Sequence, residues 1–394
     1  MGPRTRASER EPLIAAAAHL RASGFVQTVI AARLGISQAE VSRLLNAARL
    51  EGWLAETPQF KMKDEKVWRA AERRYFSVER TRASLQARYQ AGGSLLHRVT
   101  LIDILPSRRI DPASARVVAT MLGKARYVGV TWGPTIGRLV EALRELRYQA
   151  PFREMNRRID FVPLCGEPLG DPGDPGHDSS SALAKELTTE FNSGDRPTPP
   201  PSIAGVPAFI PLQFRDGIQL ETIRRFIRGV RGYANVFGAT GQPWELNGAG
   251  KQPGGGPLAS KLDAILTSVG TAADRLDRGI FLKERINCGD ITESDLERTC
   301  VGDVGGVIIR AAGISAEEGE RIDAMNDRWT GIRIDHLQQC AKAAMEEGFR
   351  PEKPGVLMLA AGARRRNVVL RCVELGLVSE LIIDHELNHT LVGE

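Results

Sequence analysis

The sequence predicts a small all-α domain at the N-terminus, joined through a helical linker to a large α/β domain. Between residues 25 and 54, apolar residues recur at helical spacing on both sides of one glycine. Residues 61–90 form a highly charged run without Gly or Pro. From residue 95 onward, short apolar runs alternate with helical stretches, which is typical of a parallel sheet covered by helices on both faces. We therefore expect three parts: residues 1–58, 59–93 and 94–394.

Composition narrows the class of protein without identifying it. A chain of 394 residues with 42% hydrophobic and 26% charged residues is typical of a soluble protein of two or three domains. Its net charge of +5 is too small to require nucleic acid as a partner. The five cysteines are scattered without a C-x-x-C pair, which predicts reduced thiols. No secretory signal and no membrane-spanning run is recognisable, so we expect a cytoplasmic protein with no membrane partner.

Two short helices joined by a tight turn are predicted at residues 25–54, behind a first helix at about 11–22. The earlier of the two ends at Gly35, which suits the positive φ of a helix terminus. Ser37, followed three residues later by Glu40, forms a capping box that begins the next helix. That helix has an apolar face and, near its N-terminal end, a face of small and hydrogen-bonding side chains. Together these features are typical of a helix-turn-helix, whose second helix reads base edges in the major groove.

We therefore expect the N-terminal part to bind double-stranded operator DNA, with an ordinary helical hairpin as the alternative. Trp53 and Leu54 begin a wing-like or connecting segment that ends at Pro58. The candidate DNA-contacting residues are Thr28, Ser37, Gln38, Ala39, Ser42 and Arg43.

The charged run carries apolar and aromatic residues on alternating three- and four-residue steps, with Arg82 as the one polar interruption. These residues are Trp68, Ala71, Tyr75, Val78, Leu85 and Tyr89. Such a seam fits either a coiled coil or a single amphipathic helix packed on its own domain. Paired helix-turn-helix units need a two-fold arrangement to read two half-sites. We therefore favour a dimerising linker and a homo-oligomer, either a dimer or a tetramer.

The large part is expected to form strands at 99–105, 127–130, 161–164, 265–269, 305–309, 356–360 and 381–383. Helices are expected at 113–122, 136–146, 182–191, 219–228, 319–323, 334–347 and 366–374. Near-continuous apolar strands of this kind predict a parallel sheet.

Three of these strands lead into turns built of small residues. Thr131, Gly133 and Thr135 follow the strand at 127–130 and precede a helix, a place where backbone amides attract anions. Ser268 and Gly270 follow the strand at 265–269, and Gly362 precedes three arginines, Arg364, Arg365 and Arg366. Because a guanidinium binds phosphate through paired hydrogen bonds, the turns predict a site for an anionic ligand.

The helix-turn-helix followed in order by GVTWGPT, CVGDVGG, MNDRWTGI and LAAGARRR…ELGLVSELIIDHE resembles the SorC/DeoR-type sugar-binding transcriptional regulators. The resemblance covers nearly the whole chain. It implies a winged helix-turn-helix domain followed by a Rossmann-like effector domain related to sugar-phosphate isomerases that has lost catalysis. It also implies a phosphorylated sugar as effector. Most members of the family are tetrameric repressors, and some are activators.

Carried over by residue, the resemblance gives the turn at 131–135 the role of gripping phosphate and Asp303 that of meeting sugar hydroxyls. Arg365 stands where the family usually has a lysine, and Asp327 and Arg328 match a partly structural signature. Two departures are Pro134 in place of a basic residue and Ser268 in place of a glycine. The full candidate effector set is Thr131, Trp132, Gly133, Thr135, Ser268, Gly270, Asp303, Asp327, Gly362 and Arg365, with Trp132 expected mainly to pack.

Two motifs point to other functions but lack essential parts. Residues 385–389 fit H-E-x-x-H, yet the chain leaves almost no room downstream for a third zinc ligand. Residues 248–251 suggest a P-loop, but Gln252 replaces the required Ser or Thr. We expect no metal, no cofactor and no catalytic residue. The expected function is a repressor of carbohydrate metabolism controlled by a sugar or sugar-phosphate effector. The alternative is a sugar-phosphate isomerase or lactonase-like enzyme with a DNA-binding appendage, for which Asp303 is the one candidate base.

Overall fold

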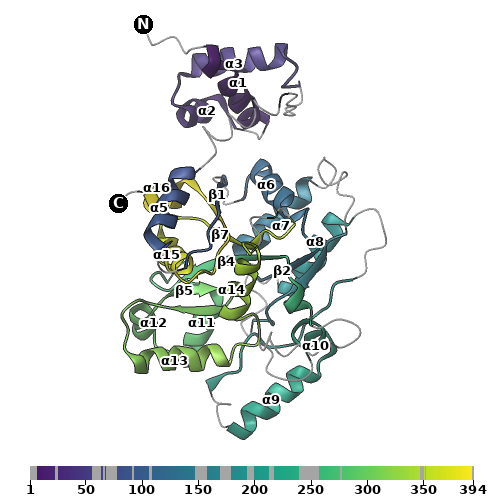
Figure 1. Ribbon diagram of the computed structural model, residues 1–394, viewed down its shortest axis with the longest axis vertical. Coiled ribbons are helices and arrows are strands. Elements are labelled where there is room, and N and C mark those ends of the chain that lie inside the picture. The colour runs from purple at the N-terminus through teal and green to yellow at the C-terminus, as the bar shows by residue number, and fades with distance from the viewer. Residues whose placement is uncertain are drawn as a thin grey trace. The chain divides into compact units, whose positions relative to one another are not determined.

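The computed structural model describes residues 7–22, 25–55, 64, 67, 78–90, 93–105, 109–146, 158–168, 179–192, 199–212, 217–238, 257–275, 277–346, 350 and 352–392. The chain divides into two compact units, Met1–Glu79 and Arg80–Glu394 (Figure 1). Among the residues described, no helix combines the length and the apolar character that crossing a membrane requires.

The first unit is a bundle of three helices, α1 (Ala7–Ala22), α2 (Gln27–Leu34) and α3 (Gln38–Leu50), each in contact with the other two. Gly35 ends α2 with a φ of 64°, and Ser37 Oγ accepts a hydrogen bond of 3.2 Å from the Glu40 N–H at the start of α3. The expected turn chemistry is therefore present. Of the predicted wing-like segment, residues 53–55 are described, and residues 56–58 lie outside the described residues.

The apolar face predicted for α3 is buried. Its four buried residues are at most 5% exposed: Val41, Leu44, Leu45 and Ala48. Helix α3 contacts α1, in which the four alanines at 15–18 are buried as well. The opposite face of α3 is left to solvent. The core of this unit thus accounts for every large apolar residue of α3 except Leu50, which is 89% exposed.

The predicted heptad seam is only partly described, because Trp68, Ala71 and Tyr75 lie outside the described residues. Its C-terminal part forms α5 (Glu79–Tyr89), which falls almost wholly in the second unit. Leu85 is 1% exposed there, and Thr81 Oγ1 donates to Asn388 Oδ1 at 2.5 Å. This part of the seam packs on its own domain, so Leu85 is not open to a partner helix. A dimerising role for the rest stays a prediction.

The second unit is built on an eight-stranded sheet. Six of its strands are parallel, in the order β1 (Arg98–Leu101), β8 (Glu380–Ile383), β7 (Gly355–Ala360), β4 (Ala264–Thr271), β2 (Tyr127–Val130) and β3 (Asp160–Pro163). After β2 the chain adds β3 on one side and then returns to add β4 on the other. The carboxyl ends of β2 and β4 therefore form a topological switch point, where α/β sheets commonly bind ligands.

The expectation of a purely parallel sheet is wrong at one place. The far end of β4 continues beyond its parallel neighbours and pairs antiparallel with β5 (Cys300–Val304), which forms a hairpin with β6 (Val307–Arg310). Gly305 and Gly306 make the hairpin turn with φ of 54° and 89°. The predicted strand at 305–309 thus starts two residues too early, and β5 was not predicted.

Helices surround the sheet (Figure 1). Those at predicted positions are α6 (Pro112–Leu122), α7 (Pro134–Leu146), α8 (Ser180–Phe191), α9 (Gly217–Gly229), α13 (Ala316–Asp327), α14 (Ile334–Ala343) and α15 (Arg366–Glu374). The helix α16 (His385–Val392) follows β8. Those not given bounds by the sequence are α10 (Arg231–Phe237), α11 (Ile280–Asn287), α12 (Glu293–Thr299) and the 3₁₀ turns η5 (Leu258–Lys261) and η6 (Ala363–Arg365). Both α7 and α14 contact the central strands β4 and β7.

Candidate functional site

The three predicted strand-end turns meet at one edge of the sheet. The register sets Val130 of β2 opposite Leu266 of β4, and Ser268 of β4 opposite Leu359 of β7. The Thr131 N–H donates to the Leu266 carbonyl at 3.1 Å. From the other side, Arg365 Nε donates to the Val269 carbonyl at 3.4 Å. The turns after β2 and β7 are therefore both tied to β4, the strand between them.

Thr131 is a structural link in this group. Its side chain is fully buried, and its hydroxyl lies 3.0 Å from Thr267 Oγ1. The hairpin turn also packs on it, because a Cβ on Gly305 would lie 2.7 Å from Thr131 Cγ2. The hydroxyl predicted to grip phosphate is thus directed to β4. The part of this turn that can still contact a ligand is the backbone after Thr131, which leads into α7.

The rest of the first turn lies close to β4 at the start of α7. A Cβ on Gly133 would come within 2.9 Å of Ser268 Oγ, so the glycine allows the two turns to approach. Thr135 is half-buried in the first turn of α7. Ser268 is 9% exposed.

Asp303 is the buried carboxylate of the site. It lies on β5 opposite Gly270 and is 5% exposed. Its Oδ2 accepts from the Gly306 N–H at 3.0 Å, whereas its Oδ1 has no hydrogen-bond partner within the described part of the chain. Gly270 and Gly279 flank Oδ1 so closely that a Cβ on either would overlap it. Burial raises the pKa of Asp303 to about 6, although the Gly306 N–H and the positive charge of Arg365 act in the opposite direction.

Arg365 is the cation of the site. It is half-buried in η6, where Nη1 donates to the Ala361 carbonyl at 2.5 Å. Gly362 has a φ of 90°, and its N–H donates to the carboxylate of Asp384 at the end of β8. Of the other two arginines, Arg364 pairs with Asp274, and Arg366 Nε donates to the Thr390 carbonyl at 3.0 Å. Only Arg365 turns toward β4.

Three aromatic rings in successive edge-to-face contact lie beside this group. Trp132 is 3% exposed and meets Phe281 edge to face, with ring centroids 4.6 Å apart. Phe281 meets Trp329 in the same way at 4.5 Å, and a Cβ on Gly306 would overlap the Trp329 ring. Trp132 therefore packs, as expected. Its Nε1 is nevertheless a buried donor without an acceptor among the described residues.

Asp327 does not join the strand-end group, contrary to its place in the candidate set. Its side chain is 66% exposed and pairs with Arg333 at 3.2 Å, beside α9 and α14. Its neighbour Arg328 is buried, and Nη1 donates to Asp290 at 2.9 Å and to the Ile210 carbonyl at 3.0 Å. The MNDR signature thus has a structural role at Arg328.

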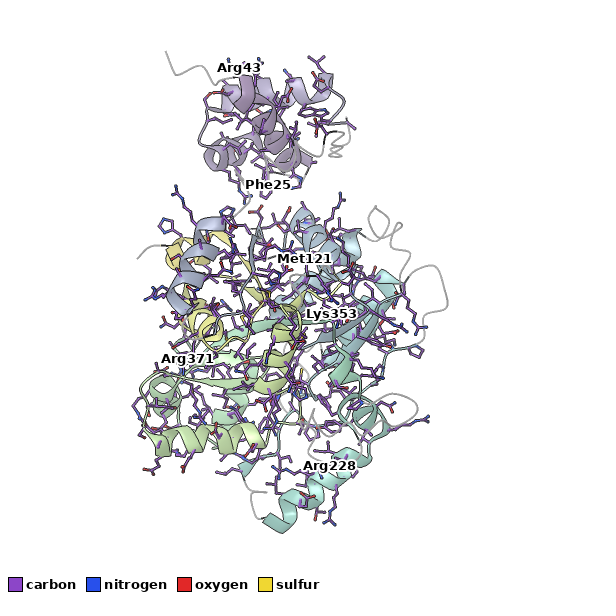
Figure 2. The ribbon with its side chains drawn as sticks, viewed as in Figure 1. Phe25, Arg43, Met121, Arg228, Lys353 and Arg371 are labelled. Atoms are coloured by element: carbon purple, nitrogen blue, oxygen red, sulfur yellow. The ribbon has the colours of Figure 1, made fainter. Side chains whose placement is uncertain are left out.

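The candidate DNA-contacting residues lie on the surface of the first unit. Thr28, Ser37, Gln38, Ala39 and Arg43 are exposed and Ser42 is half-buried. Ser37 is already used as the helix cap. Figure 2 shows Arg43 at the surface of α3, where Nε also reaches the Ala39 carbonyl at 3.4 Å. None of the six is in the core, so the face predicted to meet DNA is open.

The H-E-x-x-H segment lies on α16. His385 is exposed and pairs with Asp103 at 3.3 Å, and His389 is exposed as well. Over the part of the chain that the structure describes, no three His, Cys, Asp or Glu residues gather in a way that could hold a metal ion.

Sequence reasoning missed several residues of the site. Thr267, Gly279, Phe281 and Trp329 complete it, and none was singled out. Gly279 was the detectable one, because a glycine directly before a helix often marks a close approach of the backbone. Phe281 and Trp329 resemble ordinary core residues, and only the fold brings them to Trp132.

No protein-family model and no curated protein matches the chain. Among solved structures it is similar to the full-length sorbitol operon regulator SorC from Klebsiella pneumoniae, at 17% identity and a TM-score of 0.47, over 98% of this chain and 100% of that one. It is also similar to a DeoR family transcriptional regulator from Listeria monocytogenes, at 14% identity and a TM-score of 0.48, over 80% of this chain and 99% of that one. A third similar structure is a domain of a possible sugar-binding transcriptional regulator from Arthrobacter aurescens TC1, at 16% identity and a TM-score of 0.47, over 82% of this chain and 99% of that one.

These names agree with the resemblance noted in the sequence: the first two structures are a SorC regulator and a DeoR family regulator, and the third is a possible sugar-binding transcriptional regulator. At TM-scores below 0.5, the likeness by itself establishes neither a shared fold nor a shared function. The function has to be argued from the geometry of this chain.

Proposed function

We propose that this chain is a DNA-binding transcriptional regulator, acting as a repressor in carbohydrate metabolism. Its operator affinity is controlled by a sugar or sugar phosphate bound at the strand-end site. The observation that carries the proposal is Asp303 Oδ1, a buried acceptor beside the topological switch point that has no partner among the residues the structure describes. A buried polar atom without a partner is costly, so it points to a ligand group that completes it.

The polar atoms of the site suit a ligand with several hydroxyl groups. Asp303 Oδ1 can accept from one hydroxyl, and Trp132 Nε1 can donate to another. Arg365 and the backbone amides at the start of α7 supply positive charge for an anionic group on the same ligand. The site therefore fits a sugar, with or without a phosphate.

Control of DNA binding follows from a difference in ligand affinity between two arrangements of the subunits. A ligand shifts such an equilibrium only as far as its affinities for the two states differ. In a homo-oligomer with two heads, the shift changes how the heads match two operator half-sites. The exposed polar face of α3 supports this role for the first unit.

A second candidate function is an enzyme acting on sugar phosphates, and the raised pKa of Asp303 favours it. A carboxylate with a pKa of about 6 is suited to act as a general base. Incubating the protein with a panel of sugar phosphates separates the two. Turnover that disappears in Asp303→Asn would favour the enzyme, and binding without turnover would favour the regulator.

The ligand test is a thermal-shift screen against sugars and sugar phosphates. A ligand at about 100 times its Kd stabilises the protein by about 2.7 kcal/mol. Arg365→Gln should lose this stabilisation and the effect of the ligand on operator binding while still binding operator. The matched control is Arg364→Gln, which changes the adjacent arginine paired with Asp274 and should respond normally. An unchanged response in Arg365→Gln would remove Arg365 from the site.

The DNA test compares two arginines of the same helix. Arg43→Gln should weaken operator binding by about 1–3 kcal/mol if Arg43 reads a base. Arg49→Gln changes an exposed arginine in the last turn of α3, paired with Asn46, and should have little effect. An equal loss for Arg43→Gln on operator and on unrelated DNA would mark a phosphate contact instead.

A further inference from the structure

A cleft rich in arginine lies between helices α9 and α10 and the turn at residues 327–333. Arg224 and Arg228 come from α9, Tyr233 from α10, and Asp327 and Trp329 from the turn. Figure 2 labels Arg228 on α9. None of the strand-end turns lines this cleft.

The arginines of α9 outnumber the carboxylates that pair with them in the described part of the chain. Arg333, which is 8% exposed, pairs with Asp327 at 3.2 Å, and Arg224 Nη2 reaches only the main-chain carbonyl of Asp327, at 3.1 Å. Arg228 pairs at 3.3 Å with Glu221, a carboxylate that also lies 3.7 Å from Arg225. Arg225 and Arg228 therefore share the carboxylate of Glu221, and Arg224 makes no ion pair within the described residues.

Two hydrogen-bonding groups of residues lining the cleft have no partner among the described residues, and both are donors. Arg228 Nε is buried without an acceptor in the described structure. Trp329 also lines the cleft and is 1% exposed, and its Nε1 is likewise buried without an acceptor in the described structure. Tyr233 is 2% exposed, and burial raises the pKa of its hydroxyl, which therefore remains a donor at neutral pH. Buried donors without acceptors are costly, so the missing partner is an acceptor.

The space in the cleft is small. Its cavity of about 20 Å³ holds about one water-sized group. One oxygen of an oxyanion fits inside, with the rest of the group at the mouth. There Arg228 is 20% exposed in its side chain, and its neighbour Arg224 is half-buried.

We propose that this cleft is a binding site, separate from the strand-end site, for the oxyanion group of a small metabolite, either a phosphate or a carboxylate. Arg224 and Arg228 hold the group through charge-assisted hydrogen bonds, and the Tyr233 hydroxyl donates to its inner oxygen. The proposal does not depend on the sugar site, since the groups that hold the anion, those of Arg224, Arg228 and Tyr233, do not belong to that site.

The test is a titration of the full-length protein with orthophosphate, and separately with acetate, at constant ionic strength. Melting temperature and tryptophan fluorescence are the readouts, the second because Trp329 lines the cleft. We expect saturable binding of at least one of the two anions, and the one that binds identifies the group. The double variant Arg224→Gln/Arg228→Gln should weaken it about tenfold or more, because hydrogen bonds to charged groups are among the strongest.

Two control variants locate the effect. Arg225→Gln changes the arginine between these two, which is 79% exposed and pairs with the same Glu221, and should bind the anion normally. Arg365→Gln should also bind normally. If the double variant does not fold, Tyr233→Phe removes only the hydroxyl and should weaken binding several-fold.

Three results would overturn the proposal. The first is the absence of saturable binding of either anion to the unmodified protein. The second is equal binding by the unmodified protein and the double variant or, where the latter does not fold, by Tyr233→Phe. The third is loss of binding in Arg365→Gln, which would place the anion at the strand-end site.

Discussion

Asp303→Asn is expected to stabilise the protein at neutral pH while impairing the proposed ligand site. Burial raises the pKa of Asp303 to about 6, from 3.8 for an unperturbed aspartate. The folded protein therefore holds this proton more tightly than the unfolded chain does. The stabilisation from the bound proton is fully present below about pH 4 and is lost as the pH rises through 6. Above about pH 6, the folded state carries an unfavourable buried charge, which the uncharged amide of Asn avoids.

The size of the effect follows from the two pKa values. At 1.36 kcal/mol per pKa unit, the ionisation of Asp303 lowers the free energy of unfolding by about 3 kcal/mol at pH 8. At pH 4.5 the carboxyl is protonated in the folded protein but mostly ionised in the unfolded chain, and the loss is about 1 kcal/mol. A unit of about 315 residues, Arg80–Glu394, has an unfolding entropy of roughly 0.7 kcal/mol/K. The variant should therefore melt about 4–5 °C above the unmodified protein at pH 8, and about 1–2 °C above it at pH 4.5.

Thermal unfolding followed by tryptophan fluorescence at several pH values measures this difference. Asp323→Asn is the matched control, since its side chain is 59% exposed, and it should shift the melting temperature by less than about 1 °C. A variant less stable than the unmodified protein at pH 8 would refute the reasoning. So would a gain in stability that does not change with pH.

The remaining predictions concern one residue each. Asp290→Asn should lower the free energy of unfolding by about 3–5 kcal/mol in urea, because it leaves the buried guanidinium groups of Arg285 and Arg328 without their counterion. Ser37→Ala should destabilise α3 by about 1 kcal/mol, measured by hydrogen exchange of its amides; unchanged exchange would show that the cap contributes nothing. Gly279→Ala should abolish ligand stabilisation in the sugar screen, because its methyl group would overlap the carboxylate beside it; a normal ligand response would contradict that placement.

The local features of the fold were predictable from the sequence because they depend on neighbouring residues. Gly35 and Ser37 define the helix boundaries in the first unit through φ and a capping hydrogen bond, both short-range effects. The strands β2, β4, β7 and β8 are apolar runs buried on both faces, which the pattern identifies directly. Their turns could be placed at one sheet edge because parallel strands end on the same side.

The hairpin of β5 and β6 was harder to predict. Gly302 and Asp303 interrupt β5 with residues that are rare in strands, and the turn glycines follow at once. Pairing with β4, a long-range contact, is what makes this segment a strand. The same limit applies to Asp327, whose place beside α9 depends on a contact with Arg224 across about a hundred residues of sequence.

A comparison of Asp303 with Asp290, another buried carboxylate, shows why Asp303 points to a ligand. Both are buried in the same unit. Asp290 has both oxygens satisfied: Oδ2 by Arg285 at 2.7 Å, and Oδ1 by Arg328 at 2.9 Å and by the Leu212 N–H at 3.0 Å. That is how a structural carboxylate is held.

Asp303 has one satisfied oxygen, and the other is flanked by the glycines at 270 and 279, which keep side chains away from it. An acceptor left unpaired at a switch point, at an expected loss of about 3 kcal/mol at neutral pH, is better explained by a bound group than by folding. Folding alone would favour Asn there, which is why the melting temperature of Asp303→Asn and its ligand response should change in opposite directions.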